Sequence, residues 1–440
     1  MIRMTSLALL LTLSAIGIDP DTAAAFADLK QQPQGYYAYA TVSTEATAGG
    51  KQRLAEELAF VVCSLSSRSY LGDQIPQHVP GTDLYRLDLT GLGWQKHWNN
   101  VLVAHYPYRP ELTKKRIAPL VVKASWIVAE LPDPVQTGDA QYLLLYGFVP
   151  KTGADFRKFW KVSAAGGDTF GFLEGRSGVQ AKGAQRLMMN RDTSQRAAFF
   201  ETFDSKRVAG KTSPAEKIVP GTLTYDGQEL IVGIPKHYNG EGGTLQAYFL
   251  NNGNSDPDKR KHDTRVDVAP PDLVKDADGL RGYDIRNGID CMACHTKGMQ
   301  DPTVDEYRAL ILGGQRIYAD KITKAEIERF YQSPFAKELK RADEDYATAI
   351  RLVNGLTPQR NAAQFVACIK AHDADLDLAQ AAREVYCTPD ELKLAIANYS
   401  PNITEALAGL AQRGEITRDE WVDAQPLLQC VILPAWRTKK

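Results

Sequence analysis

The chain has 440 residues, of which 44% are hydrophobic and 24% are charged, and this composition is ordinary for a globular protein. Its 52 basic and 53 acidic side chains give a formal net charge of −1, so composition offers no footprint for nucleic acid. A single hydrophobic core stops growing at roughly 250–300 residues, and we therefore expect more than one compact region.

The N-terminus has the pattern of a secretory signal peptide. Arg3 precedes an apolar run over residues 7–18, which ends at Asp19-Pro20 and is followed by small residues. The run is shorter than the ~20 residues that cross a bilayer, and no later stretch is long and apolar enough. We expect a signal peptide over residues 1–27, with Ala25-Phe26-Ala27 as the cleavage site, and a periplasmic or secreted mature chain without a transmembrane segment.

Residues 28–214 mix short helical and strand-like segments, which predicts a mixed α/β N-terminal region. Residues 84–89 alternate imperfectly and indicate a half-buried strand. Periodicity does not decide whether residues 119–132 form a strand or a helix. Aromatic side chains at helical spacing over residues 155–160 favour a helix, and the glycine-rich residues 166–183 are typical of a loop.

The next regions differ in pattern, and together they predict an α+β fold. Residues 215–302 are a β-rich segment, in which Asp226-Gly227 is a two-residue hairpin signal and residues 244–250 are a further strand. Residues 303–440 are predicted to be mainly helical, because four pairs have the spacing of capping boxes. These pairs are Thr303 with Glu306, Thr323 with Glu326, Thr388 with Glu391, and Thr417 with Glu420.

The strongest chemical signal is Cys291-Met292-Ala293-Cys294-His295, the attachment signature of c-type haem. In such a site the two thiols form thioethers with the vinyl groups on one porphyrin edge, and the adjacent imidazole binds the iron. A structural zinc site would need a second ligand pair of this kind, which the chain lacks. A thioredoxin-like thiol pair would not call for His295. We therefore expect one covalent haem c, held by Cys291 and Cys294 and with His295 as the proximal iron ligand.

Around this motif the sequence resembles a family of secreted monohaem c-type cytochromes of planctomycete and myxobacterial type. The resemblance is carried by residues 84–89 with Gly93-Trp94, and by residues 176–179, 245–250, 265–270, 286–299 and 375–382. It implies export and a single haem. It implies no substrate, because the family has no assigned physiological reaction. Relatives tend to carry a histidine near the position of Arg191, which this chain lacks.

The iron's sixth ligand decides between electron transfer and ligand chemistry, because a methionine or histidine there closes the site. The sequence leaves several candidates open. Met299 follows His295 by four residues, and in a helix it would share the face of that histidine and could not cross the haem plane. The remaining candidates are distant in sequence: Met188, Met189 and His262, with His237 and His372 also possible.

Four further cysteines could form two disulfides in an oxidising compartment. We favour Cys368 with Cys387 and Cys63 with Cys430, although free buried thiols are the alternative. The predicted function is electron transfer or redox relay with an unknown periplasmic partner protein. A haem enzyme of peroxidase type, or a haem-based gas or redox sensor with an open distal site, is the alternative. A scaffold with a structural haem is a third possibility.

Overall fold

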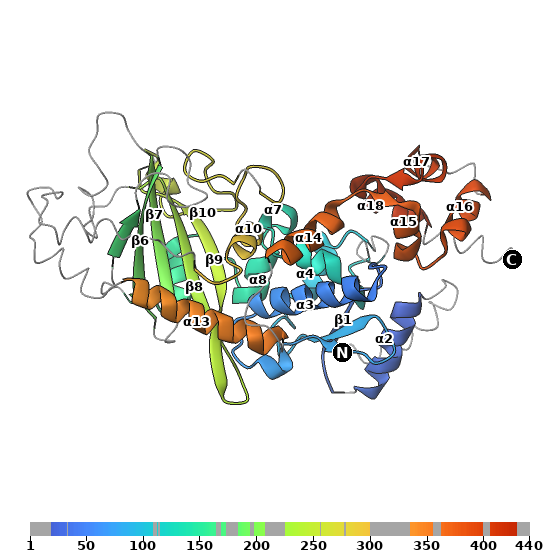
Figure 1. Cartoon of the computed structure of the whole chain (residues 1–440), viewed down its shortest axis with the longest axis horizontal. Helices are drawn as coiled ribbons and strands as arrows, with labels where there is room; N and C mark the ends of the chain where they lie inside the picture. The colour runs from blue at the N-terminus through green and yellow to red at the C-terminus, as the bar shows by residue number, and fades with distance from the viewer. Residues whose placement is uncertain are drawn as a thin grey trace, which may run out of the picture. The chain divides into compact units, whose positions relative to one another are not determined.

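The computed structural model describes residues 19–32, 34–108, 112, 115–163, 169–172, 184–193, 198–206, 225–255, 257–276, 279–299, 335–354, 362–398 and 405–428. Helices and sheets both contribute, which confirms the α+β class (Figure 1). The chain divides into two compact units, each assembled from segments far apart in sequence. Unit 1 contains residues 1–59, 75–129 and 367–440, and unit 2 contains residues 60–74 and 130–366.

Unit 1 combines a small sheet near the N-terminus with the C-terminal helices. The sheet has the strand order β2-β3-β1-β4, in which β1 pairs antiparallel with β3 and parallel with β4. The short strands β11 and β12 pair with each other; β11 connects α14 to α15, and β12 connects α17 to α18. The elements are α2 (Pro20–Gln31), β1 (Tyr37–Thr41), the first part of α3 (Ala48–Ser64), β2 (Gln77–His78), β3 (Leu84–Asp88), α4 (Trp98–His105), β4 (Val121–Lys123), α6 (Ala124–Ala129), most of α14 (Ala362–Asp373), β11 (Leu376–Asp377), α15 (Leu378–Glu384), α16 (Pro389–Asn398), α17 (Glu405–Arg413), β12 (Glu415–Ile416) and α18 (Arg418–Leu427).

Unit 2 is built on an antiparallel sheet with the order β10-β9-β8-β7-β6-β5. Its helix α13 lies against β8 and β9 (Figure 1). The elements are η1 (Leu71–Asp73), α7 (Pro134–Thr137), α8 (Ala140–Tyr146), α9 (Gly153–Phe159), β5 (Thr169–Phe172), β6 (Ala184–Asp192), β7 (Ala198–Lys206), β8 (Gly227–Tyr238), β9 (Glu241–Asn252), η3 (Lys259–Lys261), β10 (Arg265–Val266), α10 (Ile289–Cys294) and α13 (Phe335–Asn354).

The two faces of the large sheet have different partners, because side chains alternate along each strand. One face carries an apolar core, in which Phe199, Val232 and Phe249 pack against aromatic side chains of α8 and α9 such as Tyr146 and Phe156. The other face carries side chains that line a cavity beside α10. The sheet therefore separates a packed core from a cavity.

Several local predictions are confirmed, and two are wrong. Residues 84–89 contain β3, residues 155–160 lie largely in α9, and residues 119–132 form both β4 and α6. The capping boxes at Thr388 and Thr417 are formed, whereas those at Thr303 and Thr323 lie outside the described residues. The stretch 166–183, for which the sequence predicts a loop, contains strand β5. Its other residues, 166–168 and 173–183, lie outside the described part of the chain.

The hairpin prediction chose the wrong pair of turn residues. Gly227 opens β8, and the turn between β8 and β9 is Asn239-Gly240, with Tyr238 opposite Glu241. Both turn residues have positive φ, 50° and 85°, as a type I′ hairpin turn requires. Asparagine and glycine tolerate this conformation best, so the signal was present in the sequence at the later position.

Helix α2 contains the predicted cleavage site. Its N-cap Asp19 accepts a hydrogen bond from the Thr22 backbone. The buried Asp21 accepts from Thr41 and, at 2.9 Å, from the Tyr386 hydroxyl, while Ala25 is fully buried. After the predicted boundary at residue 27, Asp28 accepts from the Tyr39 hydroxyl at 2.8 Å, so the helix has side-chain contacts on both sides of that boundary.

Candidate functional site

The Cys-x-x-Cys-His segment forms a short helix that begins at a glycine. Gly288 caps α10 with φ at 83°, a conformation that favours glycine. A Cβ at this position would lie 2.3 Å from the Pro132 carbonyl oxygen and 2.6 Å from Oε1 of Gln141. Because residues three apart share one side of a helix, Cys291 and Cys294 are neighbours. The spacing of the motif thus puts both thiols on the wall of the same cavity.

This cavity lies between α10, the loop over residues 269–274 and one face of the large sheet. The space along its lining residues that protein atoms do not fill is about 930 Å³, a figure that includes open solvent. Its lining is mainly apolar, with Met188, Ile231, Leu250 and Val274 among its members. Cys291, Cys294 and His295 all line it, as the motif predicts for a haem site.

His295 is oriented by a backbone carbonyl. Its Nδ1 lies 2.9 Å from the Gly298 oxygen, and a carbonyl oxygen can only accept, so the contact places the proton on Nδ1. Burial lowers the pKa of His295, although the Glu229 carboxylate acts in the opposite direction. The ring is therefore neutral at physiological pH, and Nε2 keeps the lone pair that a metal needs. Metal-binding histidines in proteins are commonly oriented in this way.

The thiols have the protonation state of inert cysteines. Burial raises the pKa of Cys291, and it raises the pKa of Cys294 to about 12. The Cys291 sulfur lies 3.7 Å from Oε1 of Glu229, whose negative charge acts in the same direction. A reactive Cys-x-x-Cys pair needs a depressed pKa. The surroundings of these two thiols therefore do not favour a thiol redox pair.

A buried ion pair contributes to the polar part of the lining. Arg186 of β6 binds both oxygens of Asp204 at 2.8 and 2.9 Å, and its Nη1 lies 3.4 Å from Glu229. Burial opposes the charge on Arg186, but the two carboxylates outweigh it and raise the pKa of the guanidinium. Arg186 therefore stays charged in this mainly apolar cavity. Sequence reasoning did not find it, because no local pattern marks a cation that three strands bring together with its partners.

The sequence candidates for the sixth iron ligand differ in whether their side chains line the cavity. Met188 and Met189 are both buried, but they are consecutive in β6 and point to opposite faces, and only Met188 lines the cavity. Met299 also lines it. The helical argument against Met299 was wrong in its premise, because α10 ends at Cys294. His262 follows η3 and is absent from the lining.

Two further histidine candidates do not line the cavity either. His237 lies near the end of β8, where its ring centroid is 5.8 Å from that of Tyr70. His372 belongs to unit 1, whereas the haem motif belongs to unit 2. Among the described residues, the methionines Met188 and Met299 are thus the sequence candidates that share a cavity with His295.

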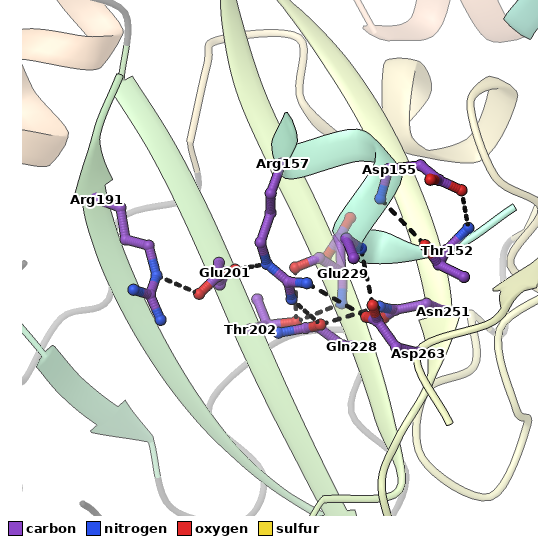
Figure 2. A network of polar contacts seen from close by, with 11 residues as sticks. Thr152, Asp155, Arg157, Arg191, Glu201, Thr202, Gln228, Glu229, Asn251 and Asp263 are labelled. Carbon is purple, nitrogen blue, oxygen red and sulfur yellow. Dashed lines mark hydrogen bonds and ion pairs between the residues drawn. The ribbon is translucent and has the colours of Figure 1, made fainter. Parts of the chain in front are cut away.

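A polar network links α9 to the sheet, as Figure 2 shows. The buried Glu201 accepts from Arg157 of α9 and, at 2.5 Å, from Arg191 of β6. Arg157 also donates to Gln228 at 2.8 Å. Arg191 lies three positions after the cavity-lining Met188 in β6, so it is directed to the other face of the sheet. It takes part in anchoring α9 to the sheet.

The remaining cysteines that the structure describes lie outside the cavity. Cys368 and Cys387 are both half-buried, and each takes part in an interaction with its surroundings, so their predicted pairing stays a prediction. Cys63 is fully buried, and burial raises the pKa of its thiol to about 12. Its predicted partner Cys430 lies outside the described residues.

Comparison of the chain with protein-family models, curated proteins and solved structures gives no significant match. The family resemblance stays a prediction from the sequence. Among the described residues, no helix combines the length and the apolar character that a bilayer crossing requires.

Proposed function

We propose that the protein is an exported monohaem c-type cytochrome whose function is electron transfer. The observation that carries this proposal is the shared position of Cys291, Cys294 and His295 on one mainly apolar cavity wall, with Nδ1 of His295 already occupied. Two thiols and a neutral imidazole are the donor set that haem c requires. When bound, the haem would supply reversible one-electron chemistry.

Met188 is the residue that would hold the iron together with His295. The Cys291 sulfur lies beside Glu229 on β8, and the rings of His295 and Tyr248 on β9 have centroids 5.5 Å apart. Met188 lies on β6, opposite Thr202 of β7, which in turn bonds to the backbone of Glu229. Strands β6 and β9 are three spacings apart, or about 14 Å. Met188 thus enters the cavity from a different strand than the one that the His295 ring contacts.

Met299 is the weaker candidate for a positional reason. It directly follows Gly298, whose carbonyl binds the His295 ring, so its backbone lies on the His295 side of the cavity. A haem held by both His295 and Met188 would be suited to electron transfer, since methionine–histidine ligation is typical of electron carriers.

The test is spectroscopy of the full-length protein produced with an export and haem-attachment system. The proposal expects one covalently bound haem and a low-spin, six-coordinate spectrum that carbon monoxide and cyanide do not change. Replacing Cys291 and Cys294 with alanine should abolish haem staining on a denaturing gel. A high-spin spectrum with rapid carbon monoxide binding would instead support the haem enzyme or gas sensor, and a protein without haem would refute the proposal.

A further inference from the structure

The orientation of His295 depends on a single peptide group, the one that joins Gly298 to Met299. Its carbonyl oxygen accepts from Nδ1 of His295 at 2.9 Å. Its N–H, on residue 299, donates to Oδ1 of Asp343 at 2.7 Å. Because a peptide group is planar, fixing its N–H also fixes the direction of its carbonyl. The carboxylate of Asp343 and the imidazole of His295 are thus connected through one rigid unit.

We propose that Asp343 is a positioning residue for the iron ligand His295, acting through the Gly298–Met299 peptide. This inference rests on the proposed function, since it gives Asp343 a role toward the haem iron. A negative charge at the N–H polarises the peptide, which makes its carbonyl a stronger acceptor. A stronger acceptor at Nδ1 makes Nε2 more basic, as carboxylate partners do for other metal-binding histidines. Asp343 therefore holds the ring in place and would stabilise an oxidised iron bound to it.

The backbone around Gly298 is adapted to this contact. Gly298 has φ at 102°, where a side chain is strained, and a Cβ there would lie 2.4 Å from Oδ1 of Asp343. Glycine is thus needed both for the turn that follows the haem motif and for the approach of the carboxylate. A substitution at this position would displace Asp343 from the peptide.

Helix α13 supplies Asp343, which follows His295 by 48 residues in the sequence. Its buried stripe of Leu339, Ala342, Tyr346 and Ala349 has helical spacing and faces the protein interior. Gly243 of β9 lets the helix backbone come close, because a Cβ there would lie 2.2 Å from the Asp345 carbonyl oxygen. Asp343 directly follows a residue of this stripe, so the packing of α13 on the sheet sets the position of its carboxylate.

The experiment compares Asp343→Ala and Asp343→Asn with Glu344→Gln, all as full-length protein carrying covalent haem. Glu344 is adjacent to Asp343 and exposed, and its substitution by glutamine removes the same negative charge. The first readout is solvent exchange of the His295 Nδ1 proton, followed by NMR in the reduced state. We expect exchange about tenfold faster in Asp343→Ala, as loss of one charge-assisted hydrogen bond implies, and near-normal exchange in Asp343→Asn, whose amide oxygen still accepts.

The second readout is the reduction potential, which should rise in both Asp343 variants by more than in Glu344→Gln. It keeps the test decisive if Asp343→Ala does not fold, because asparagine has the shape of aspartate. The inference is overturned if Asp343→Asn and Glu344→Gln shift the potential equally, or if exchange in Asp343→Ala matches the wild type. Absence of covalent haem from the wild type would be a different result, and it would remove the proposed function itself.

Discussion

Replacing Met188 with leucine tests the assignment of the axial ligand, and the neighbouring Met189 supplies a matched control. Both side chains are buried, 5% and 2% exposed, and both belong to β6. A leucine has nearly the volume of methionine, so each substitution should cost less than about 1.5 kcal/mol of folding free energy. Only Met188 faces the cavity with the haem motif. The two variants should therefore have similar stability and different iron coordination.

The expected result for Met188→Leu is a five-coordinate, high-spin haem that binds carbon monoxide, still attached through Cys291 and Cys294. Its reduction potential should fall by on the order of 0.1 V, because a methionine ligand raises the potential within the ~0.8 V range that axial ligands span. Met189→Leu should keep the wild-type spectrum and potential. The assays are absorption spectroscopy with and without carbon monoxide, and redox titration.

The reasoning is refuted if Met188→Leu stays low-spin, or if Met189→Leu changes the spectrum as much. A third variant, Met299→Leu, tests whether Met299 is the iron ligand instead. If it alone becomes high-spin, the ligand comes from the His295 side, and the argument from strand positions is wrong.

Three further predictions concern the structure around the site and unit 1. Gly288→Ala places a Cβ against the Pro132 carbonyl and strains a residue with positive φ, at a cost of at least 1–2 kcal/mol; we expect a lower Tm and a smaller haem-loaded fraction. Burial alone would raise the pKa of Glu384, but Lys123 and Arg418 together lower it to about 2. Glu384 thus stabilises the fold by roughly 3 kcal/mol above pH 4.5, and this stabilisation is lost as the pH falls toward 2. In Glu384→Gln the free energy of unfolding, measured by urea titration, should fall less steeply below pH 4.5 than in the wild type. An unchanged pH dependence would contradict the ion-pair account. A chain that begins at residue 28 loses Asp21 and the buried Ala25, so it should unfold at lower urea than one that begins at residue 19; equal midpoints would show that α2 is dispensable.

The parts of the site that could be predicted from sequence are those in which neighbouring residues determine the geometry. Cys291, Cys294 and His295 share one helical turn and its end, so their spacing is sufficient to bring them together. Capping boxes at Thr388 and Thr417 are local for the same reason. Met188 and Met189 could not be told apart, because which one faces the cavity depends on the register of β6 in a six-stranded sheet.

The parts that could not be predicted depend on contacts between distant segments. Arg186, Asp204 and Glu229 meet only because three strands pair, and Asp343 meets the Gly298–Met299 peptide only because α13 packs on the sheet. The hairpin error has a different origin, since Asp226-Gly227 and Asn239-Gly240 are both valid turn signals. The choice between them is made by the length of β8, which continues through Tyr238.

Mass spectrometry of the exported full-length protein under denaturing conditions measures the central claim most directly. The account predicts that the mature chain carries the mass of one haem, and that the mass returns to that of the bare polypeptide in the double variant Cys291→Ala with Cys294→Ala. A wild-type protein with the mass of the polypeptide alone, produced where haem attachment is active, would contradict it.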